Sequence, residues 1–390
     1  MQKKVLFTAS TFSHILNFHL PYLAQFKRLG WQVHVACGGA PAAGLPEIPG
    51  ADAVFSLPLQ KKMLAAGNFR AARLLRQKIA AEKYALISTH TSLAAFFTRL
   101  AMPASRPLLL NIVHGYLFDD QTPALKKTVL LTAEKLTAGC TDLLLTMNRW
   151  DLTAAQKHHL GRQIDFIPGI GVDFARFADF TTGDGVAASQ SLRNQLGLRP
   201  QDWLLVYAAE FSGRKSQAVL LRALAELPRI MADELPGRVV LLLAGQGDKL
   251  AECKQLAAQL GLLAEGGPVR AVFPGQCNDM PLWYAAADAA VSASRSEGLP
   301  FNIMEAMYAG LPVVASAVKG HVDLLQQEES GLLYPYGDAH ACAVLLARLW
   351  QEPGVVERLG QNARQQVQQY GLEQVFPQVW AQYEKLIEQI

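Results

Sequence analysis

Short apolar runs alternate along the chain with longer stretches in which apolar positions recur every three or four residues. The runs predict buried strands, and the longer stretches predict amphipathic helices. Near the amino end, a strand at 3–9 precedes a loop at 10–14, a helix at 17–29 and a strand at 31–37. Repeated strand–helix–strand units of this kind predict a doubly wound parallel sheet with helices on both faces, which is the α/β class.

The alternation is interrupted once, at residues 174–190, where hydrophobic periodicity is weak and turn-forming residues gather. We interpret this stretch as a linker between two α/β domains. The first is expected to span residues 1–178 and the second residues 190–372. A final helical pattern covers residues 372–390.

The stretch 292–314 carries the strongest chemical signal. A buried strand leads into a polar loop with Glu297, and a helix follows with Pro300 near its first position. Unpaired N–H groups at a helix start favour phosphate, and Glu305, about one turn inside the helix, is suited to hydroxyls on neighbouring carbons. A phosphate beside such a diol indicates a nucleotide. Alternatively, Glu305 caps its own helix and Glu297 is a solvated loop acid.

Two adjacent cations, Arg214 and Lys215, follow the predicted strand 203–208 and open a helix. Their position is where a diphosphate would lie, and their charge suits a departing phosphate. The alternative is a pair of exposed cations, which is electrostatically unfavourable at a helix N-terminus.

Two histidines lie at predicted strand ends. His114 ends the apolar strand 108–114, at the sheet edge where ligands of open α/β sheets bind. His14 lies in the first strand–helix turn, which lacks the G-x-G-x-x-G of dinucleotide-binding proteins. His14 could meet a phosphate or form only local hydrogen bonds, and His114 could equally be structural.

Residues 297–301 (EGLPF), 305–307 (EAM) and 310–314 (GLPVV) together resemble the E-x7-E signature of retaining, family-four glycosyltransferases. The resemblance implies the GT-B fold, with two Rossmann-like domains facing a cleft. It also implies that the last helix, about 373–390, crosses back to the first domain. The turn at His14 resembles that of a subgroup acting on polysaccharides or lipid-linked oligosaccharides.

The resemblance also implies roles for individual residues. His114 and Glu297 would act on the transferred sugar, and His14 would lie on the acceptor side. Glu210 stands where the family has an arginine, and Arg214 would compensate. The implied donor-binding residues are Arg214, Lys215, Gly298, Leu299, Pro300, Phe301, Glu305 and Gln276.

The composition is that of a globular protein, with 51% apolar and 18% charged residues. The net charge of +3 hides an asymmetry, because residues 1–150 carry 17 Lys and Arg against 7 Asp and Glu. A basic helical stretch at 61–83 is either a solvated face or a surface for anionic lipid. No nucleic-acid-binding motif accompanies it. Five scattered cysteines and the absence of a long apolar run favour a cytoplasmic protein. The basic first half and the resemblance to the polysaccharide subgroup imply a peripheral position on the inner face of the cell membrane.

Together with these observations, the resemblance implies a retaining hexosyl- or N-acetylhexosaminyltransferase that uses a nucleotide-sugar, expected to be a UDP-sugar, without a further cofactor. The acceptor would be a membrane-associated glycan or lipid-linked molecule in surface polysaccharide or glycoconjugate synthesis. The chain has no D-x-D sequence, so no metal is expected at the donor. The alternatives are a sugar-nucleotide epimerase of similar fold, a transferase to a small soluble acceptor, and a non-catalytic nucleotide-sugar-binding module.

Overall fold

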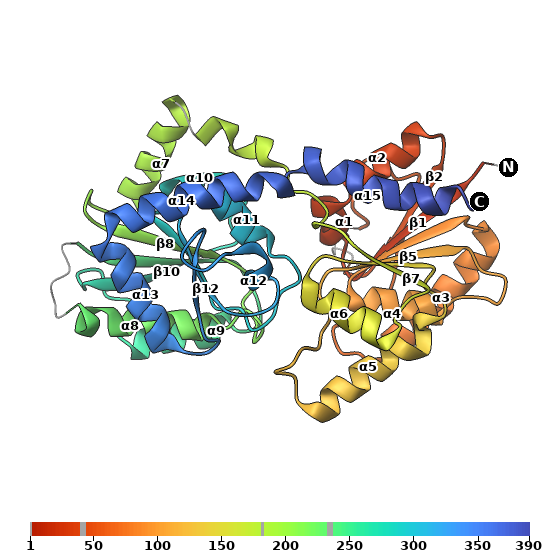
Figure 1. The fold of residues 1–390 in the computed structure, drawn as a ribbon, viewed down its shortest axis with the longest axis horizontal. Coiled ribbons are helices and arrows are strands. Elements are labelled where there is room, and N and C mark those ends of the chain that lie inside the picture. The colour runs from red at the N-terminus through yellow and green to blue at the C-terminus, as the bar shows by residue number, and fades with distance from the viewer. Residues whose placement is uncertain (1, 40–43, 181–182, 232–236) are drawn as a thin grey trace. The chain divides into compact units, whose positions relative to one another are not determined.

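The computed structural model describes residues 2–39, 44–180, 183–231 and 237–390. These residues form two compact units, Met1–Gly171 with Glu373–Ile390, and Val172–Leu372 (Figure 1). The boundary falls at Gly171, seven residues before the expected end of the first domain. In the described residues, no helix combines the length and apolar character that crossing a membrane requires.

Unit 1, as we call the first, contains a seven-stranded parallel sheet in the order β3-β2-β1-β4-β5-β6-β7. Its strands are β1 (Lys4–Ala9), β2 (Gln32–Cys37), β3 (Ala53–Ser56), β4 (Leu86–His90), β5 (Leu108–Val113), β6 (Leu143–Thr146) and β7 (Gln163–Phe166). Its helices are α1 (Phe12–Phe18), α2 (Leu20–Arg28), α3 (Ala66–Glu82), α4 (Ser92–Leu100), α5 (Ala124–Ala138), α6 (Arg149–His158) and most of α15 (Leu372–Ile387).

Unit 2, the second, contains a six-stranded parallel sheet in the order β10-β9-β8-β11-β12-β13. Its strands are β8 (Trp203–Ala208), β9 (Val239–Ala244), β10 (Val269–Gly275), β11 (Ala289–Ser292), β12 (Val313–Ser316) and β13 (Leu332–Tyr334). Its helices are η1 (Phe174–Phe180), α7 (Gly183–Gln195), α8 (Gln217–Ile230), α9 (Leu250–Gln259), α10 (Met280–Ala286), α11 (Phe301–Tyr308), α12 (His321–Leu324), α13 (Ala339–Gln351), α14 (Pro353–Val367) and η2 (Gln368–Tyr370).

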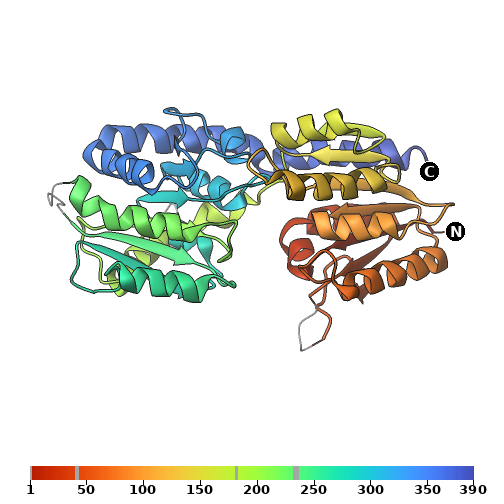
Figure 2. The same cartoon turned by 90° about the horizontal axis from the view of Figure 1, so that it is seen from below.

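Helices cover both faces of each sheet, so each unit has the doubly wound α/β architecture that the alternation of patterns predicted (Figure 2). The central strands are almost entirely buried, as parallel strands between two helical layers must be, whereas the edge strands β3 and β7 are partly exposed. The prediction that the last helix joins the first domain is also confirmed, because Tyr383 of α15 hydrogen-bonds Ser88 of β4 (2.7 Å). The aromatic rings of Phe376 and Trp380 pack on Tyr22 and Phe26 of α2.

Three local predictions were wrong. Residues 174–190, expected as a linker, are mostly helical in η1 and α7. Phe177 of η1 packs beside Tyr284 of α10, so this segment is part of unit 2. The first helix begins at Phe12, so His14 lies in its first turn and not in a loop. The basic stretch expected as helical over 61–83 forms helix α3 only from Ala66 onward, and its Leu75 and Ile79 are buried in the core of unit 1.

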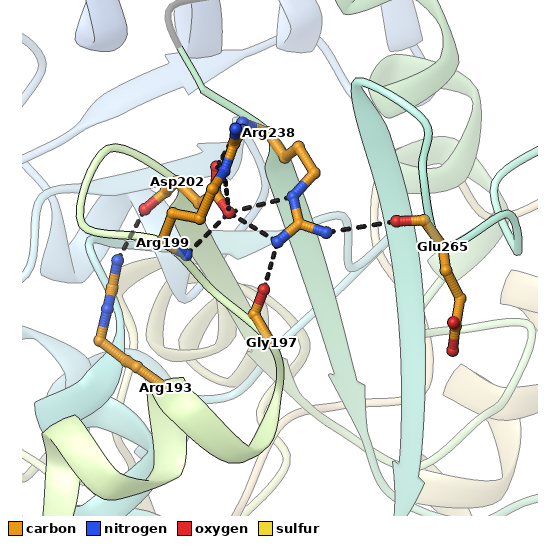
Figure 3. A network of polar contacts seen from close by, with 6 residues as sticks. All are labelled: Arg193, Gly197, Arg199, Asp202, Arg238 and Glu265. Atoms are coloured by element: carbon orange, nitrogen blue, oxygen red, sulfur yellow. Dashed lines mark hydrogen bonds and ion pairs between the residues drawn. The ribbon is translucent and has the colours of Figure 1, made fainter.

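At the amino edge of the second sheet, a network around Asp202 joins β8 to β9 (Figure 3). The side chain of Asp202 is fully buried and accepts hydrogen bonds from the backbone N–H groups of Arg199 (2.9 Å) and Arg238 (2.8 Å). Both guanidinium groups also contact it, and the pKa of Asp202 lies well below its ordinary value: burial alone would raise it, but these hydrogen bonds outweigh burial. The network lies at the edge opposite the strand ends that carry candidate site residues, so it serves the fold.

Candidate functional site

The order of strands in unit 2 locates a candidate ligand site. From β8 the chain proceeds outward through β9 to β10, and from β11 it proceeds the other way through β12 to β13. The carboxyl ends of β8 and β11 therefore flank the point where the winding reverses, which is where open α/β sheets bind ligands. Lys215 follows β8 and Glu297 follows β11.

The structure brings three of the predicted residues into one ion cluster, which we call the Glu297 triad (Arg214, Lys215 and Glu297). The Lys215 ammonium donates to Glu297 Oε1 at 2.6 Å, and Arg214 Nη1 donates to Oε2 at 2.7 Å. Arg214 Nη1 also donates to the backbone oxygen of Ser296 at 3.0 Å. Glu297 is buried with a side chain 6% exposed, whereas 45% of the Arg214 side chain is exposed.

The triad fixes the charge of its members. Burial alone would raise the pKa of Glu297, but the Lys215 and Arg214 charges outweigh it and hold this pKa well below its ordinary value. Burial lowers the pKa of Lys215, and the Glu297 carboxylate opposes that effect. Glu297 is therefore ionised at neutral pH, and the cations next to it carry one more charge than they need to neutralise it.

Buried polar groups hold the two strand ends of the triad together. The Tyr207 hydroxyl, at the end of β8, donates to the backbone oxygen of Lys215 (3.0 Å) and contacts Ser294 Oγ beyond β11 (2.8 Å). The backbone N–H of Arg295 donates to the Arg214 oxygen (2.7 Å). The loops after β8 and β11 therefore form one connected unit.

A glycine after β12 closes the triad from the third strand. Gly320 has φ +82°, and a Cβ at this position would lie 2.7 Å from the Gly298 oxygen and 2.8 Å from Glu297 Cβ. Only glycine therefore allows this close approach. The Gly320 N–H donates to Asp323 Oδ2 at 3.1 Å, so Asp323 caps the start of α12.

His321, next in the chain, is fully buried beneath the same loop. Its Nδ1 contacts the Ser316 backbone oxygen at 2.7 Å, and its Nε2 contacts Ser292 Oγ at 3.2 Å. Burial lowers its pKa to about 4. A neutral imidazole in this position ties β11 to β12 beneath the triad.

Helix α11 begins directly after the triad loop, with Pro300 as its N-cap. Gly298, Leu299 and Pro300 are buried, and Phe301 is partly exposed. The amino end of α11 thus lies close after the carboxyl end of β11, as the sequence predicted. The N-terminal partial charge of α11 adds to the two cations in favouring an anion here.

Glu305, the predicted diol acceptor, lies in the second turn of α11 in an environment unlike that of Glu297. Its nearest cation is Arg176 of η1, with 3.9 Å between Nη1 and Oε1. Burial raises the pKa of Glu305 to about 7, although Arg176 and the Tyr284 hydroxyl oppose that shift. Among the described residues, Glu305 thus has no cation as close as those that contact Glu297. This environment is suited to binding a neutral group that donates hydrogen bonds to the carboxyl.

Two further residues flank the site at strand ends. Gln276 follows β10 and Glu210 follows β8, and both side chains are exposed. The backbone oxygen of Glu210 accepts a hydrogen bond from Gln217 of α8 at 2.9 Å. The structure thus gives the Glu210 backbone a structural role, and the role of Gln276 toward a ligand remains a prediction.

The G-x-G after β9 has a packing role. Gly245 and Gly247 both have strongly positive φ, and a Cβ on either would collide with the backbone of Ala209 and Phe211. The two glycines therefore allow the loops after β8 and β9 to pack closely.

In unit 1 the winding reverses between β1 and β4, and four histidines converge at the carboxyl ends of the central strands. They form what we call the histidine cluster: His14, His19, His90 and His114. The Nε2 atoms of His14 and His114 are 3.4 Å apart, so the structure brings the two predicted histidines together. His19 and His90, which the sequence analysis did not single out, complete the cluster.

All four imidazoles of the histidine cluster are neutral at pH 7. Burial lowers the pKa of His14 to about 4. Burial, and then repulsion between the rings, lowers the pKa of His19, His90 and His114 well below the ordinary value. In the described part of the chain this is the cluster of His, Cys, Asp and Glu whose ligand atoms converge closely enough for a metal ion.

Each residue that the sequence analysis missed reaches its site through a contact between segments that are distant in the sequence. Arg176 was placed in the supposed linker, and His19 and His90 lie 71 residues apart. Only the strand order could have identified His90, since it ends β4 at the reversal point. His19 follows His14 by five residues, which is a weak signal for a shared site.

Family models match both halves of the chain. Residues 20–169 match a "Glycosyl transferase 4-like domain", and residues 188–366 match "Glycosyl transferases group 1". "Putative glycosyltransferase EpsD" of Bacillus subtilis is 32% identical over 368 residues, covering 93% of this chain and 92% of that protein.

Two further similarities concern proteins with named ligands. "UDP-Gal:alpha-D-GlcNAc-diphosphoundecaprenol alpha-1,3-galactosyltransferase" of Escherichia coli is 25% identical, over 73% of this chain and 71% of its own. HepE of Anabaena, solved in complex with UDP and glucose, superposes with a TM-score of 0.77 at 21% identity. That comparison covers 98% of this chain and all of HepE, and it shows the shared fold.

Proposed function

We propose a donor, an acceptor and a mechanism for this chain, which belongs to the family-four type of glycosyltransferases with the GT-B fold. The donor is a nucleotide-sugar, and a UDP-sugar fits best. Membership of a transferase family argues against the epimerase alternative. The observation that carries the proposal is the Glu297 triad at the reversal point of unit 2.

The donor diphosphate is assigned to Arg214 and Lys215. Both cations contact the one carboxylate of Glu297, so the three contacting groups together carry a net positive charge that favours an anion. The exposed Glu210 carboxylate also acts on both cations, but only through its charge at a greater distance. Lys215 supplies a buried point charge and Arg214 a more exposed fork, and both stabilise negative charge that develops on the leaving diphosphate. Loop residues 298–301 line the same position at the start of α11.

The ribose is assigned to Glu305 and the base to the turn at Gln276. Ribose hydroxyls donate hydrogen bonds, and a carboxylate can accept two of them at once. Binding them would favour the charged form of Glu305, whose pKa burial raises in the free protein. The UDP bound by HepE supports uridine as the nucleoside.

The proposed reaction retains the configuration of the sugar. The bond between the anomeric carbon and the diphosphate breaks as the acceptor oxygen attacks the same face, and the acceptor proton passes to the departing phosphate. His114 contacts the transferred sugar, Glu297 orients its hydroxyls while holding both cations, and His14 lies on the acceptor side. The triad contacts support the cation-holding part of the role of Glu297.

The proposed acceptor is a glycan or lipid-linked molecule at an anionic membrane surface. The E. coli relative is named for a diphosphoundecaprenol acceptor, which supports this class. Helix α3 exposes Arg70, Arg73 and Arg76. Helix α5 exposes Leu125 (80%) and Leu136 (78%) on one face beside lysines, a pattern typical of surfaces that rest on lipid. Both helices belong to unit 1.

Donor binding tests the carrying observation. Calorimetry with UDP should show binding to the wild type, and Lys215→Ala or Glu305→Ala should weaken it by at least about tenfold, as expected for a lost charged hydrogen bond. Lys249→Ala, a surface lysine of unit 2 paired with Glu252, is the matched control. Full UDP affinity and full transfer in both site variants would refute the proposed site.

Vesicle flotation tests the acceptor surface. The protein should float with anionic vesicles, less so with neutral ones, and binding should weaken as salt rises. Replacing Arg70, Arg73 and Arg76 by Gln should reduce flotation. The same change at Arg222, Arg229 and Lys254, which are exposed in unit 2, should leave it unchanged. If the triple variant of α3 floats as well as the wild type does, the proposed lipid surface is wrong. A product that stays in water would favour a soluble acceptor.

Turnover should not fall in EDTA, because two cations and a helix N-terminus stand where other transferases place a metal. Strict dependence on Mn²⁺ would contradict this expectation. An assay of sugar transfer to an acceptor distinguishes an enzyme from a non-catalytic module, because such a module would bind the donor without transferring its sugar.

A further inference from the structure

We propose that the histidine cluster of unit 1 binds one divalent transition-metal ion of the Zn²⁺ class, with one nitrogen from each of His14, His19, His90 and His114. This inference concerns a site separate from the donor diphosphate. Metal binding there does not depend on the proposed function.

The spacing of the ring nitrogens carries the proposal. His14 Nε2 lies 3.4 Å from His114 Nε2 and 3.3 Å from His19 Nε2, and His114 Nε2 lies 3.4 Å from His90 Nδ1. Zn–N bonds of about 2.0–2.1 Å in a tetrahedron place neighbouring nitrogens roughly 3.3–3.4 Å apart. Direct N–H···N hydrogen bonds would draw the rings closer, to about 3 Å. All four nitrogens lie within 4.8 Å of one another.

The rings are also in the state that a metal requires. Neutral imidazoles expose a lone pair on the ligating nitrogen, and burial keeps all four rings neutral. Because the rings lie so close together, protonation of one disfavours protonation of the others, and the cluster carries no positive charge of its own. A metal ion is the positive charge that this set of lone pairs can accept.

A hydrogen-bond chain behind His90 fixes which nitrogen faces the cluster. His90 Nε2 contacts Ser88 Oγ at 3.0 Å, and Ser88 Oγ contacts the Tyr383 hydroxyl at 2.7 Å. His90 Nδ1 is left to face His114. Outer partners of this kind orient the ligands of metal sites and raise their basicity.

The donor set selects the class of ion. Four imidazoles and no carboxylate suit Zn²⁺, Co²⁺, Ni²⁺ or Cu²⁺, whereas Mg²⁺ and Mn²⁺ prefer oxygen ligands. A bound ion would occupy His14 and His114, the two histidines assigned to the acceptor and the transferred sugar. The consequence, which does rest on the proposed function, is that Zn²⁺ inhibits transfer.

Absorption of Co²⁺ tests the site without reference to activity. The full-length protein, freed of metal with EDTA and dialysed, is titrated with Co²⁺. We expect the intense visible bands of a tetrahedral site, saturating at one ion per chain and displaced by Zn²⁺. The thiolate charge-transfer band should be missing, since the five cysteines are not ligands. A wild type that takes up no Co²⁺ overturns the proposal.

Single substitutions assign the ligands. His14→Gln, on a partly exposed ring, and His90→Gln, on a buried one, should each weaken Co²⁺ binding at least about 100-fold while circular dichroism shows a folded chain. His340→Gln, an exposed histidine beside Glu226 in unit 2, is the matched control and should bind as the wild type does. Wild-type affinity in both cluster variants would place the ion elsewhere and overturn the proposal.

The inhibition experiment distinguishes the two claims. Stoichiometric Co²⁺ binding with no transferase activity under any condition would leave the metal site standing and refute the proposed function. Transfer that Zn²⁺ does not inhibit, in a protein with one Zn²⁺ bound at the cluster, would refute the roles given to His14 and His114.

Discussion

Two glutamates eight residues apart occupy opposite electrostatic environments within unit 2. Glu297 lies between two cations at 2.6 and 2.7 Å, so its charge is fully compensated. Glu305 is also largely buried, but its nearest cation is 3.9 Å away. The first carboxylate therefore stabilises the free protein, whereas the second costs free energy until a ligand donates hydrogen bonds to it.

The cost at Glu305 predicts a pH-dependent gain from Glu305→Gln. Its folded-state pKa of about 7 exceeds the ordinary value of 4.5, so the folded state binds a proton more tightly than the unfolded state. Wild-type stability is thus lost as pH rises from about 4.5 through 7. The variant has no carboxyl here to lose its proton, so this loss of stability is absent from it. Its free energy of unfolding should therefore exceed that of the wild type by an amount that grows over this pH range to at most about 3 kcal/mol.

Chemical denaturation of both proteins at pH 4.5, 6 and 8 measures the advantage, and calorimetry with UDP measures the accompanying loss of affinity. Glu357→Gln, an exposed glutamate of α14, is the control and should show no such trend. A variant less stable than the wild type at pH 8 would contradict the assigned environment of Glu305.

The triad predicts the reverse behaviour for Glu297→Gln. Because the folded-state pKa is depressed, the carboxylate contributes stability that is present above about pH 4.5 and is lost as pH falls. Removing it leaves Lys215 buried without its counter-charge, which should cost about 3 kcal/mol at pH 7. The difference in free energy of unfolding between the variant and the wild type should become smaller below pH 4.5.

A double-mutant cycle with Lys215→Met checks this interpretation. If the cost comes from an uncompensated buried ammonium, the double variant should be more stable than the sum of the two single changes predicts. Denaturant midpoints of the four proteins measure the coupling. Strict additivity would show that the ion pair contributes nothing to folding.

At the scale of single residues, the sequence predicts the residues of the Glu297 triad and of the loop before α11, because its signals there are local. Arg214 and Lys215 are adjacent, and Glu297 to Phe301 are consecutive. Arg176, His321 and His90 could not be predicted in the same way. Each is brought to a site by strand order or by packing of a distant helix, and neither leaves a pattern in the neighbouring residues.

At the scale of elements, the close approach of the loop after β12 to the loop after β11 predicts an asymmetry between two glycines. Gly320 and Gly337 share almost the same φ, +82° and +83°, so Ala at either position should cost about 1 kcal/mol in backbone strain. Around Gly337 there is open space, whereas a Cβ on Gly320 would meet Glu297 and Gly298. Gly320→Ala should therefore cost more, and only it should weaken UDP binding.

Urea denaturation and UDP calorimetry on the two alanine variants separate strain from steric collision. Equal losses of stability with unchanged UDP affinity would mean that the loop after β12 yields freely and does not position the triad.

Elements were predicted well where hydrophobic periodicity continued and poorly where a helix lacked it. The bounds of β8 agree with the predicted residues 203–208, and β5 ends one residue before the predicted strand 108–114 does. Helix α7 was missed because Gly183 and Gly185 fall in its first turn and few of its residues are buried. The start of α1 was missed although Thr11 is its N-cap, because the polar residues around Thr11 are also typical of a loop.

At the scale of the whole molecule, the two ends of the chain build one unit. The sequence alone suggests a final helix, and only the resemblance to GT-B proteins assigned it to the first domain. The contacts explain the assignment, because α15 carries a buried apolar face that covers α2 and β4 of unit 1. Unit 1 therefore cannot complete its core until the last residues of the chain are present.

Deleting residues 373–390 should consequently unfold unit 1 selectively. The deletion removes five buried side chains, Val375, Val379, Trp380, Tyr383 and Leu386, each worth about 2 kcal/mol of burial. Their sum is comparable with the whole stability of a domain, about 5–15 kcal/mol. Hydrogen exchange read by mass spectrometry should show lost protection in β1 and β4, while β8 and β9 of unit 2 stay protected.

Deleting only residues 388–390, which are exposed, is the control and should leave exchange in both sheets unchanged. If β1 and β4 kept their protection without α15, unit 1 would be complete in the first 171 residues. The aromatic contacts of α15 with Tyr22 and Phe26 would then be incidental to folding. Equal loss of protection in both sheets would instead show that the two units unfold together, so that α15 stabilises the molecule as one cooperative body.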